Sequence, residues 1–109
     1  MNEINLLIEA MEQTRKSGLK SALATVVSVR GSAYRREGAK MFIDENENMI
    51  GMISGGCLES DVAEQAKVVM DTGLAILKTY ELDEDLVWGL GLGCPGTVKI
   101  YIEPICPLA

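Results

Sequence analysis

Hydrophobic and polar residues follow two periods along this chain, which predict two helices and five strands. Apolar residues recur about every 3.6 positions, the period of a helix, over residues 2–17 and 58–72. Shorter stretches rich in β-branched or alternating apolar residues predict strands at 19–30, 40–43, 49–53, 75–81 and 97–103. Gly18 and Gly73 follow the two helical stretches, where a helix-terminating glycine is expected.

The order of these elements predicts the fold class. The chain runs helix, strand, hairpin, helix, strand, strand, with no internal repeat and no linker. This order favours an α+β domain, a single mixed sheet of about five strands with two helices packed on it. The apolar run within residues 19–30 indicates a central strand, and the polar residues 44–48 are typical of a hairpin connection. We expect one domain over residues 1–109.

The last strand also has a predicted orientation and end. Val98, Ile100 and Ile102 alternate with other residues, so their side chains should face the core. We expect Pro104 and Pro107 to end the regular structure, because proline lacks the backbone donor that a strand uses. Cys106, which lies between the two prolines, is then incidental to function.

The turn before the second helix is the strongest candidate for a functional site. Gly55 and Gly56 allow positive φ and a close approach of backbone N–H groups to an anion. Cys57 opens the helix, where the peptide dipoles favour the thiolate, which is both a nucleophile and a metal ligand. Glu59, Asp61 and Glu64 oppose this, because nearby negative charge raises a thiol pKa. The direction of the net shift stays open, and a tight turn with a buried, inert cysteine is the alternative.

A cluster of cations follows the first strand. Arg30, Arg35, Arg36 and Lys40 lie close together in sequence, among glycines and a serine. Arginine side chains match phosphate or carboxylate oxygens in pairs, so the cluster predicts an anion site. The alternative is a solvated turn whose arginines pair with the excess carboxylates of the chain.

Residues 91–96 satisfy the glycine pattern of a dinucleotide-binding turn, G-x-G-x-x-G. That pattern needs a helix after it to receive the pyrophosphate, whereas here Pro95 interrupts and a strand pattern follows. We therefore expect a flexible glycine loop that binds no dinucleotide.

Composition argues against several classes of function. The net charge of −6 argues against nucleic-acid binding, and no apolar stretch approaches the ~20 residues that span a bilayer. The N-terminus does not resemble a signal peptide, so we expect a cytoplasmic protein. Three cysteines and no histidine fit neither a disulfide framework nor a conventional zinc site. The lack of histidine also disfavours most hydrolase mechanisms.

Three motifs together resemble the XdhC/CoxI family over nearly the whole chain. They are Arg30-Gly31-Ser32 with the cations after it, the run Ile53 to Glu59, and Gly91-Leu92-Gly93-Cys94. The resemblance implies a maturation factor for xanthine dehydrogenase or carbon monoxide dehydrogenase that handles molybdenum cofactor. This chain departs from the family in having Pro95-Gly96 after the second cysteine, where two glycines are usual. We also expect it to lack the Rossmann-like C-terminal domain that many members carry.

The resemblance and the residues together give a predicted site. We expect the cofactor to be bound by Ser54, Gly55, Gly56, Cys57, Glu59, Arg30, Arg35, Arg36, Lys40, Gly93 and Cys94, with Cys57 also a metal ligand. Cations and N–H groups would hold the phosphate of the molybdopterin, and a soft thiolate suits the metal. The resemblance implies an insertion factor rather than an enzyme. Its partner would be the apoenzyme of a molybdenum hydroxylase.

Other partners and functions remain open. A separate Rossmann-type protein, a cysteine desulfurase and a second copy of this chain, forming a homodimer, are the further partners that we consider. The first alternative function is a thiol redox protein or enzyme that uses Cys57 with Cys94 as a resolving partner. The second is a purely structural module that docks a larger protein.

Overall fold

A computed structural model describes residues 3–31, 37–53, 58–82 and 96–105. Two helices and five strands lie within these residues, as the sequence pattern predicts. The helices are α1 (Glu3–Lys16) and α2 (Glu59–Thr72). The strands are β1 (Ser21–Gly31), β2 (Lys40–Asp44), β3 (Met49–Gly51), β4 (Ile76–Leu82) and β5 (Gly96–Ile105). The predicted α+β class is confirmed.

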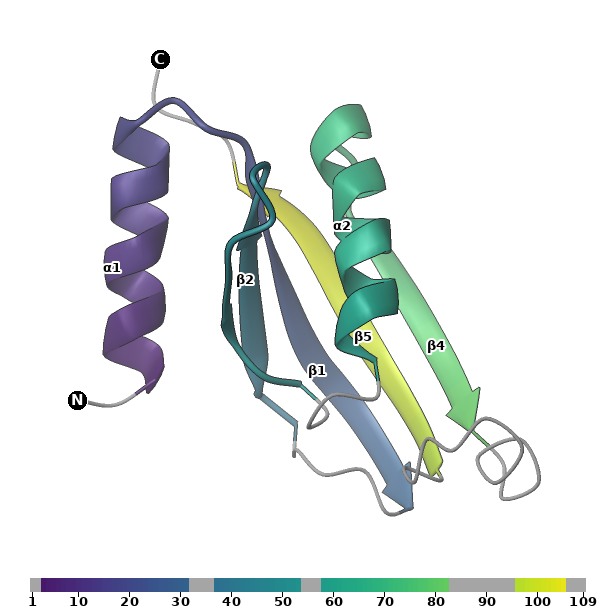
Figure 1. Cartoon of the computed structure of the whole chain (residues 1–109). Coiled ribbons are helices and arrows are strands. Elements are labelled where there is room, and N and C mark those ends of the chain that lie inside the picture. Colours follow the sequence, from purple (N-terminus) through teal and green to yellow (C-terminus); the bar gives the residue numbers. More distant parts are fainter. Residues whose placement is uncertain (1–2, 32–36, 54–57, 83–95, 106–109) are drawn as a thin grey trace.

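The five strands form one sheet in the order β3-β2-β1-β5-β4, so β1 is central, as predicted (Figure 1). β2 and β3 form the predicted hairpin, with Phe42 opposite Ile50. All four pairings are antiparallel, whereas a mixed sheet was expected. The reason is the place of β5, which inserts between β1 and β4 and runs opposite to both. β3 and β4 are therefore the two edge strands.

The main core lies between the sheet and α2. Side chains of β1, β2 and β5 alternate in direction, and every second one reaches this core. The predicted orientation of β5 is confirmed, since Val98, Ile100 and Ile102 are all buried in it. The remaining buried members of the core are Ala22, Ala24, Val26, Met41, Ile43, Ile53, Leu58, Val62, Ala66, Val69 and Met70.

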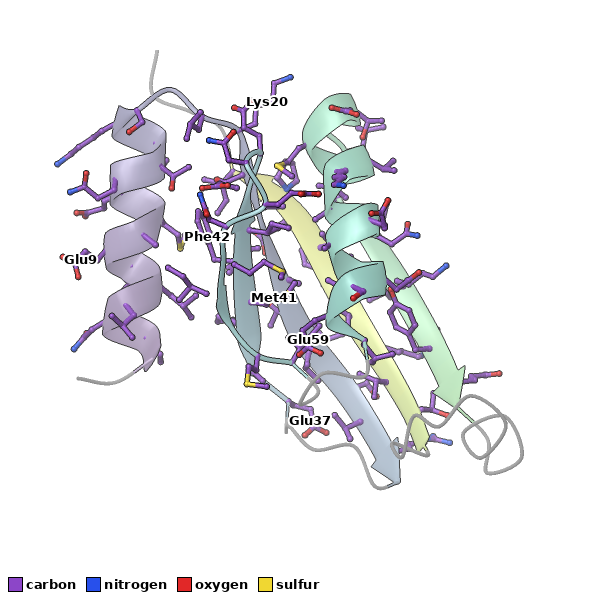
Figure 2. All side chains as sticks on the ribbon, in the orientation of Figure 1. Glu9, Lys20, Glu37, Met41, Phe42 and Glu59 are labelled. Atoms are coloured by element: carbon purple, nitrogen blue, oxygen red, sulfur yellow. The ribbon has the colours of Figure 1, made fainter. Side chains whose placement is uncertain are left out.

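The opposite face of the sheet is covered by α1 over β2 and β3 (Figure 1). Met41 and Phe42 are neighbours in β2 and leave it on opposite sides (Figure 2). Met41 belongs to the main core, whereas Phe42 and Leu7 of α1 are buried outside it. The sheet is thus packed on both faces at β2.

Both glycines predicted to end helices adopt the left-handed conformation. Gly73 is the C-cap of α2 with φ of 72°, and its N–H donates to the carbonyl of Val69 at 2.9 Å. Gly18 follows α1 with φ of 76°. Positive φ is strained for residues with a Cβ, which explains glycine at both places.

The prediction that Pro104 ends the regular structure is wrong. β5 continues to Ile105, and Pro104 pairs with Ala22 of β1. The reason lies in the length of β4, whose first residue, Ile76, pairs with Ile102. Beyond Ile102, the described part of β5 pairs on its β1 side alone, and proline is tolerated where a strand has such an unpaired side.

Candidate functional site

The elements that flank the three sequence motifs meet at one end of the molecule (Figure 1). β1, β3 and β4 run toward this end, while β2 and β5 begin there, because neighbouring strands are antiparallel. α2 also begins there, at Glu59. Each motif connects elements that meet at this end, which we call the motif end.

Three of the predicted site residues lie in the described part of the chain, namely Arg30, Lys40 and Glu59. The others lie outside the described residues: Arg35, Arg36, Ser54, Gly55, Gly56, Cys57, Gly93 and Cys94. The expected glycine loop at 91–96 also lies outside them, except for Gly96, the first residue of β5.

Arg30 and Lys40 extend from the sheet face opposite α2. Arg30 is exposed near the end of β1 and pairs in register with Thr97. Lys40 begins β2, and its Nζ donates a hydrogen bond to Thr25 Oγ1 at 3.4 Å. Val29 and Met41, the neighbours of these two cations, pack against the α2 side, so alternation places the cations on the other face.

A bulge in β1 helps to set the position of Arg30. The register of β1 against β5 shifts between Val26 and Ser28. At the same place, Val26 donates its N–H to Ala39 at 2.9 Å and accepts the N–H of Gly38 at 2.7 Å. A bulge redirects the side chains after it, so this irregularity fixes the face on which Arg30 lies.

Glu59 occupies the first position of α2 and turns back toward the end of the hairpin. Its Oε2 accepts the backbone N–H of Ile53 at 2.9 Å. Leu58, the N-cap, makes no side-chain cap hydrogen bond because its side chain is aliphatic. Glu59 and Asp61 both place negative charge in the first turn, where the helix dipole stabilises it.

Asp61 also lies in the first turn of α2, and it accepts a hydrogen bond from edge strand β4. The hydroxyl of Tyr80 in β4 donates to Asp61 Oδ2. Burial, and then the hydrogen bond from the hydroxyl to Asp61, raise the pKa of Tyr80 well above its ordinary value. Sequence reasoning treated Glu59 and Asp61 as charges near Cys57, and Glu59 also as a cofactor ligand, and it missed both hydrogen bonds. Acidic residues in the first turn of a helix are a weak signal for such bonds, because the helix dipole alone favours them there.

The three described site residues share the motif end but not one surface. Glu59 lies on the α2 side of the sheet, near the lower end of that helix in Figure 2. Arg30 and Lys40 lie on the other face. The structure therefore brings them to one end of the sheet without placing the cations against Glu59.

A hollow lies at the opposite end of the molecule, and no predicted site residue lines it. Its volume is about 400 Å³, and it is lined by Lys20, Glu45, Asn46, Glu47, Lys67, Met70 and Asp71. Lys67 pairs with Glu47, and this hydrogen-bonded ion pair lowers the pKa of Glu47 and raises that of Lys67. Within the described residues, no group of three or more histidine, cysteine, aspartate or glutamate side chains could hold a metal ion.

None of the helices that the structure describes has the length and apolar character needed to cross a membrane.

The motif end and the sheet together define a class, an α+β domain with an antiparallel sheet in which the elements flanking the glycine- and cysteine-bearing motifs meet at one end. Residues 14–81 match the sequence profile of the XdhC and CoxI family. The chain belongs to this family, which confirms the resemblance drawn from its motifs.

Two individual proteins are similar to this chain in sequence. The chain is 35% identical over 107 residues to a Bacillus subtilis protein named as a probable subunit of xanthine dehydrogenase, covering 96% of this chain and 32% of the relative. It is 40% identical over 57 residues to the molybdenum cofactor insertion chaperone PaoD of Escherichia coli, covering 52% of this chain and 18% of the chaperone.

A crystal structure described as a xanthine dehydrogenase, from Bacillus halodurans, has the same fold. It matches with a TM-score of 0.75 and 38% identity, covering 95% of this chain and 30% of that one. The chain thus spans about a third or less of the length of these proteins.

Proposed function

We propose that this protein is a maturation factor that binds molybdenum cofactor transiently and assists its insertion into a molybdenum hydroxylase such as xanthine dehydrogenase or carbon monoxide dehydrogenase. The observation that carries the proposal is the 40% identity over 57 residues to a chaperone named for insertion of this cofactor. Membership of the XdhC and CoxI family supports the same function.

The described residues at the motif end fit the charge of such a cargo. Molybdenum cofactor carries a phosphate, and Arg30 and Lys40 are cations on one face of the sheet at that end. Guanidinium and ammonium groups are common phosphate partners. Arg35 and Arg36 are proposed to add to this positive side, and Cys57 to contact the metal, with Ser54, Gly55, Gly56, Gly93 and Cys94 nearby.

Binding is tested by mixing the purified protein with freshly released molybdenum cofactor and separating the mixture by gel filtration. We expect pterin and molybdenum to elute with the protein. The double change Arg35→Gln and Arg36→Gln should lower retention most at low salt and progressively less as salt is added, because salt screens the attraction that these cations give the parent protein. Unchanged retention at low salt would remove these two residues from the site. A parent protein that elutes free of pterin and molybdenum would contradict the proposal.

The cysteines provide matched variants for the same assay. Cys57→Ser nearly keeps the side-chain volume but replaces a soft ligand by a hydroxyl that stays protonated, so retention should fall sharply. Cys94→Ser should have a smaller effect and Cys106→Ser none. Delivery is measured by reconstituting a cofactor-free molybdenum hydroxylase with each variant. If Cys57→Ser retains and delivers cofactor like the parent, the thiol is not a ligand.

A further inference from the structure

The first turn of α2 is hydrogen-bonded toward both edges of the sheet. Glu59 accepts the N–H of Ile53, which lies just beyond edge strand β3. Asp61 accepts the hydroxyl of Tyr80 in β4, the other edge strand. The two carboxylates therefore have separate tasks. Asp61 fastens the helix to the sheet, and Glu59 fastens it to the chain that leads into it.

The bond to Ile53 joins the two ends of the connection that carries the Gly-Gly-Cys motif. Ile53 and Leu58, which flank residues 54–57, are buried in the same core at 1% and 4% exposure. Both ends of the connection are thus anchored by packing. The hydrogen bond at 2.9 Å from Ile53 to Glu59 then closes the connection across them.

The backbone N–H of Ile53 needs a hydrogen-bond acceptor, which Glu59 provides. The residue follows β3, outside the regular pairing of the sheet, and its side chain is buried. A backbone donor beside a buried side chain costs free energy unless an acceptor replaces water. Glu59 supplies that acceptor from the first position of α2, across residues 54–57.

From these contacts we infer that Glu59 is a positioning residue of the proposed cofactor site. Its carboxylate holds the ends of residues 54–57 together and does not itself contact the cofactor. This inference rests on the proposed function, and it refines the expectation that Glu59 binds the cofactor directly. A carboxylate is also a poor partner for a phosphate-bearing cargo, since like charges repel.

Three substitutions separate the hydrogen bond from the charge. Glu59→Gln removes the charge and keeps an acceptor oxygen at the same reach. Glu59→Asp keeps the charge on a side chain one methylene shorter. Glu59→Ala removes both. Glu64→Gln is the matched control, because it removes a carboxylate from the same helix at an exposed position whose partner is Lys67.

The first measurement is hydrogen exchange of the Ile53 amide, with the Val69 amide inside α2 as an internal reference. We expect exchange at Ile53 to quicken at least tenfold in Glu59→Ala and Glu59→Asp. It should stay within about threefold of the parent in Glu59→Gln, since a charged acceptor is only moderately stronger than a neutral one. Exchange at Val69 and thermal unfolding followed by circular dichroism check that each variant is folded.

The second measurement is the alkylation rate of Cys57, read by peptide mass spectrometry so that Cys94 and Cys106 are told apart. Loss of the hydrogen bond should raise this rate in the Ala and Asp variants. Cofactor retention should separate the variants in the same way. We expect Glu59→Gln to retain nearly as much cofactor as the parent, and Glu59→Ala and Glu59→Asp to retain at least fivefold less.

The inference would be overturned if the Glu59 variants grouped by charge rather than by hydrogen bond. If the Asp variant behaves like the parent and the Gln variant like Ala, the charge of Glu59 matters and its hydrogen bond does not. Unchanged exchange at Ile53 in Glu59→Ala would also overturn it. A parent protein that retains no cofactor refutes the proposed function alone, because exchange at Ile53 and alkylation of Cys57 still decide the role of Glu59.

Discussion

Changing Tyr80 to Phe removes one hydroxyl and tests how strongly α2 is fastened to β4. The ring stays, and with it the packing against the core and the contact with Lys78, whose Nζ lies 5.9 Å from the ring centroid. A hydrogen bond to a charged acceptor contributes about 1.5–3 kcal/mol when buried. Asp61 is exposed, so solvent screening reduces this, and we expect a loss of about 1 kcal/mol in the free energy of unfolding.

The assay is chemical denaturation in a double-mutant cycle with Asp61→Asn. The two substitutions touch the same bond, so their effects should not add, and the coupling energy should be about 0.5–1 kcal/mol. A coupling indistinguishable from zero would show that the hydroxyl and the carboxylate do not interact in solution, and the fastening of α2 to β4 would then rest on packing.

The same bond predicts a pH dependence with a definite sign. Burial and the bond to Asp61 raise the pKa of Tyr80 above its ordinary value of 10.0, so the folded protein holds the phenol proton more tightly than the unfolded chain. The stabilisation is therefore complete below pH about 10 and is lost as pH rises toward the folded pKa. The advantage of the parent over Tyr80→Phe should shrink above pH 10, and a constant difference from pH 8 to 11 would refute this account.

Two further substitutions test local features of the fold by chemical denaturation. Asp44 is 7% exposed, and its carboxylate accepts hydrogen bonds from the N–H of Asn46 at 2.8 Å, the N–H of Asn48 at 3.1 Å and Asn48 Nδ2 at 3.0 Å. Asp44→Ala should lower the free energy of unfolding by about 2–3 kcal/mol, and a loss below 1 kcal/mol would mean that water replaces these bonds. Gly73→Ala should cost about 1 kcal/mol through strain alone, because φ is 72° and nothing lies within 4 Å of the added Cβ, whereas an unchanged stability would mean that the cap relaxes.

Local patterns in the sequence were enough to predict the elements and the ends of the two helices. Helical spacing placed α2, and Gly73 marked its end, because the hydrogen bonds and φ values concerned lie within one helical turn. The hairpin of β2 and β3 was equally visible, since its polar connection joins two adjacent apolar stretches. The alternation of Val98, Ile100 and Ile102 predicted which face of β5 is buried. Each of these features depends on residues close together in the sequence.

The candidate site was predicted only in part. The motifs identified the family, and the convergence of their flanking elements at one end follows from the antiparallel order of the strands. The tasks of Glu59 and Asp61 were missed, because their partners, Ile53 and Tyr80, are recognised only once α2 lies on the sheet. The family resemblance put Arg30, Lys40 and Glu59 into one predicted cofactor site, yet alternation along the strands places the cations on the face opposite α2.

The sequence by itself determined which segments are helices and strands, where the two helices stop and to which family the chain belongs. The tertiary structure decided the place of β5 between β1 and β4, and with it the tolerance of Pro104 within a strand. It also decided which carboxylate meets which donor. The physical reason is the distance along the chain over which each effect acts. Periodicity and capping act among neighbouring residues, whereas strand order, sheet face and hydrogen-bond partner depend on segments far apart in the chain that only folding brings together.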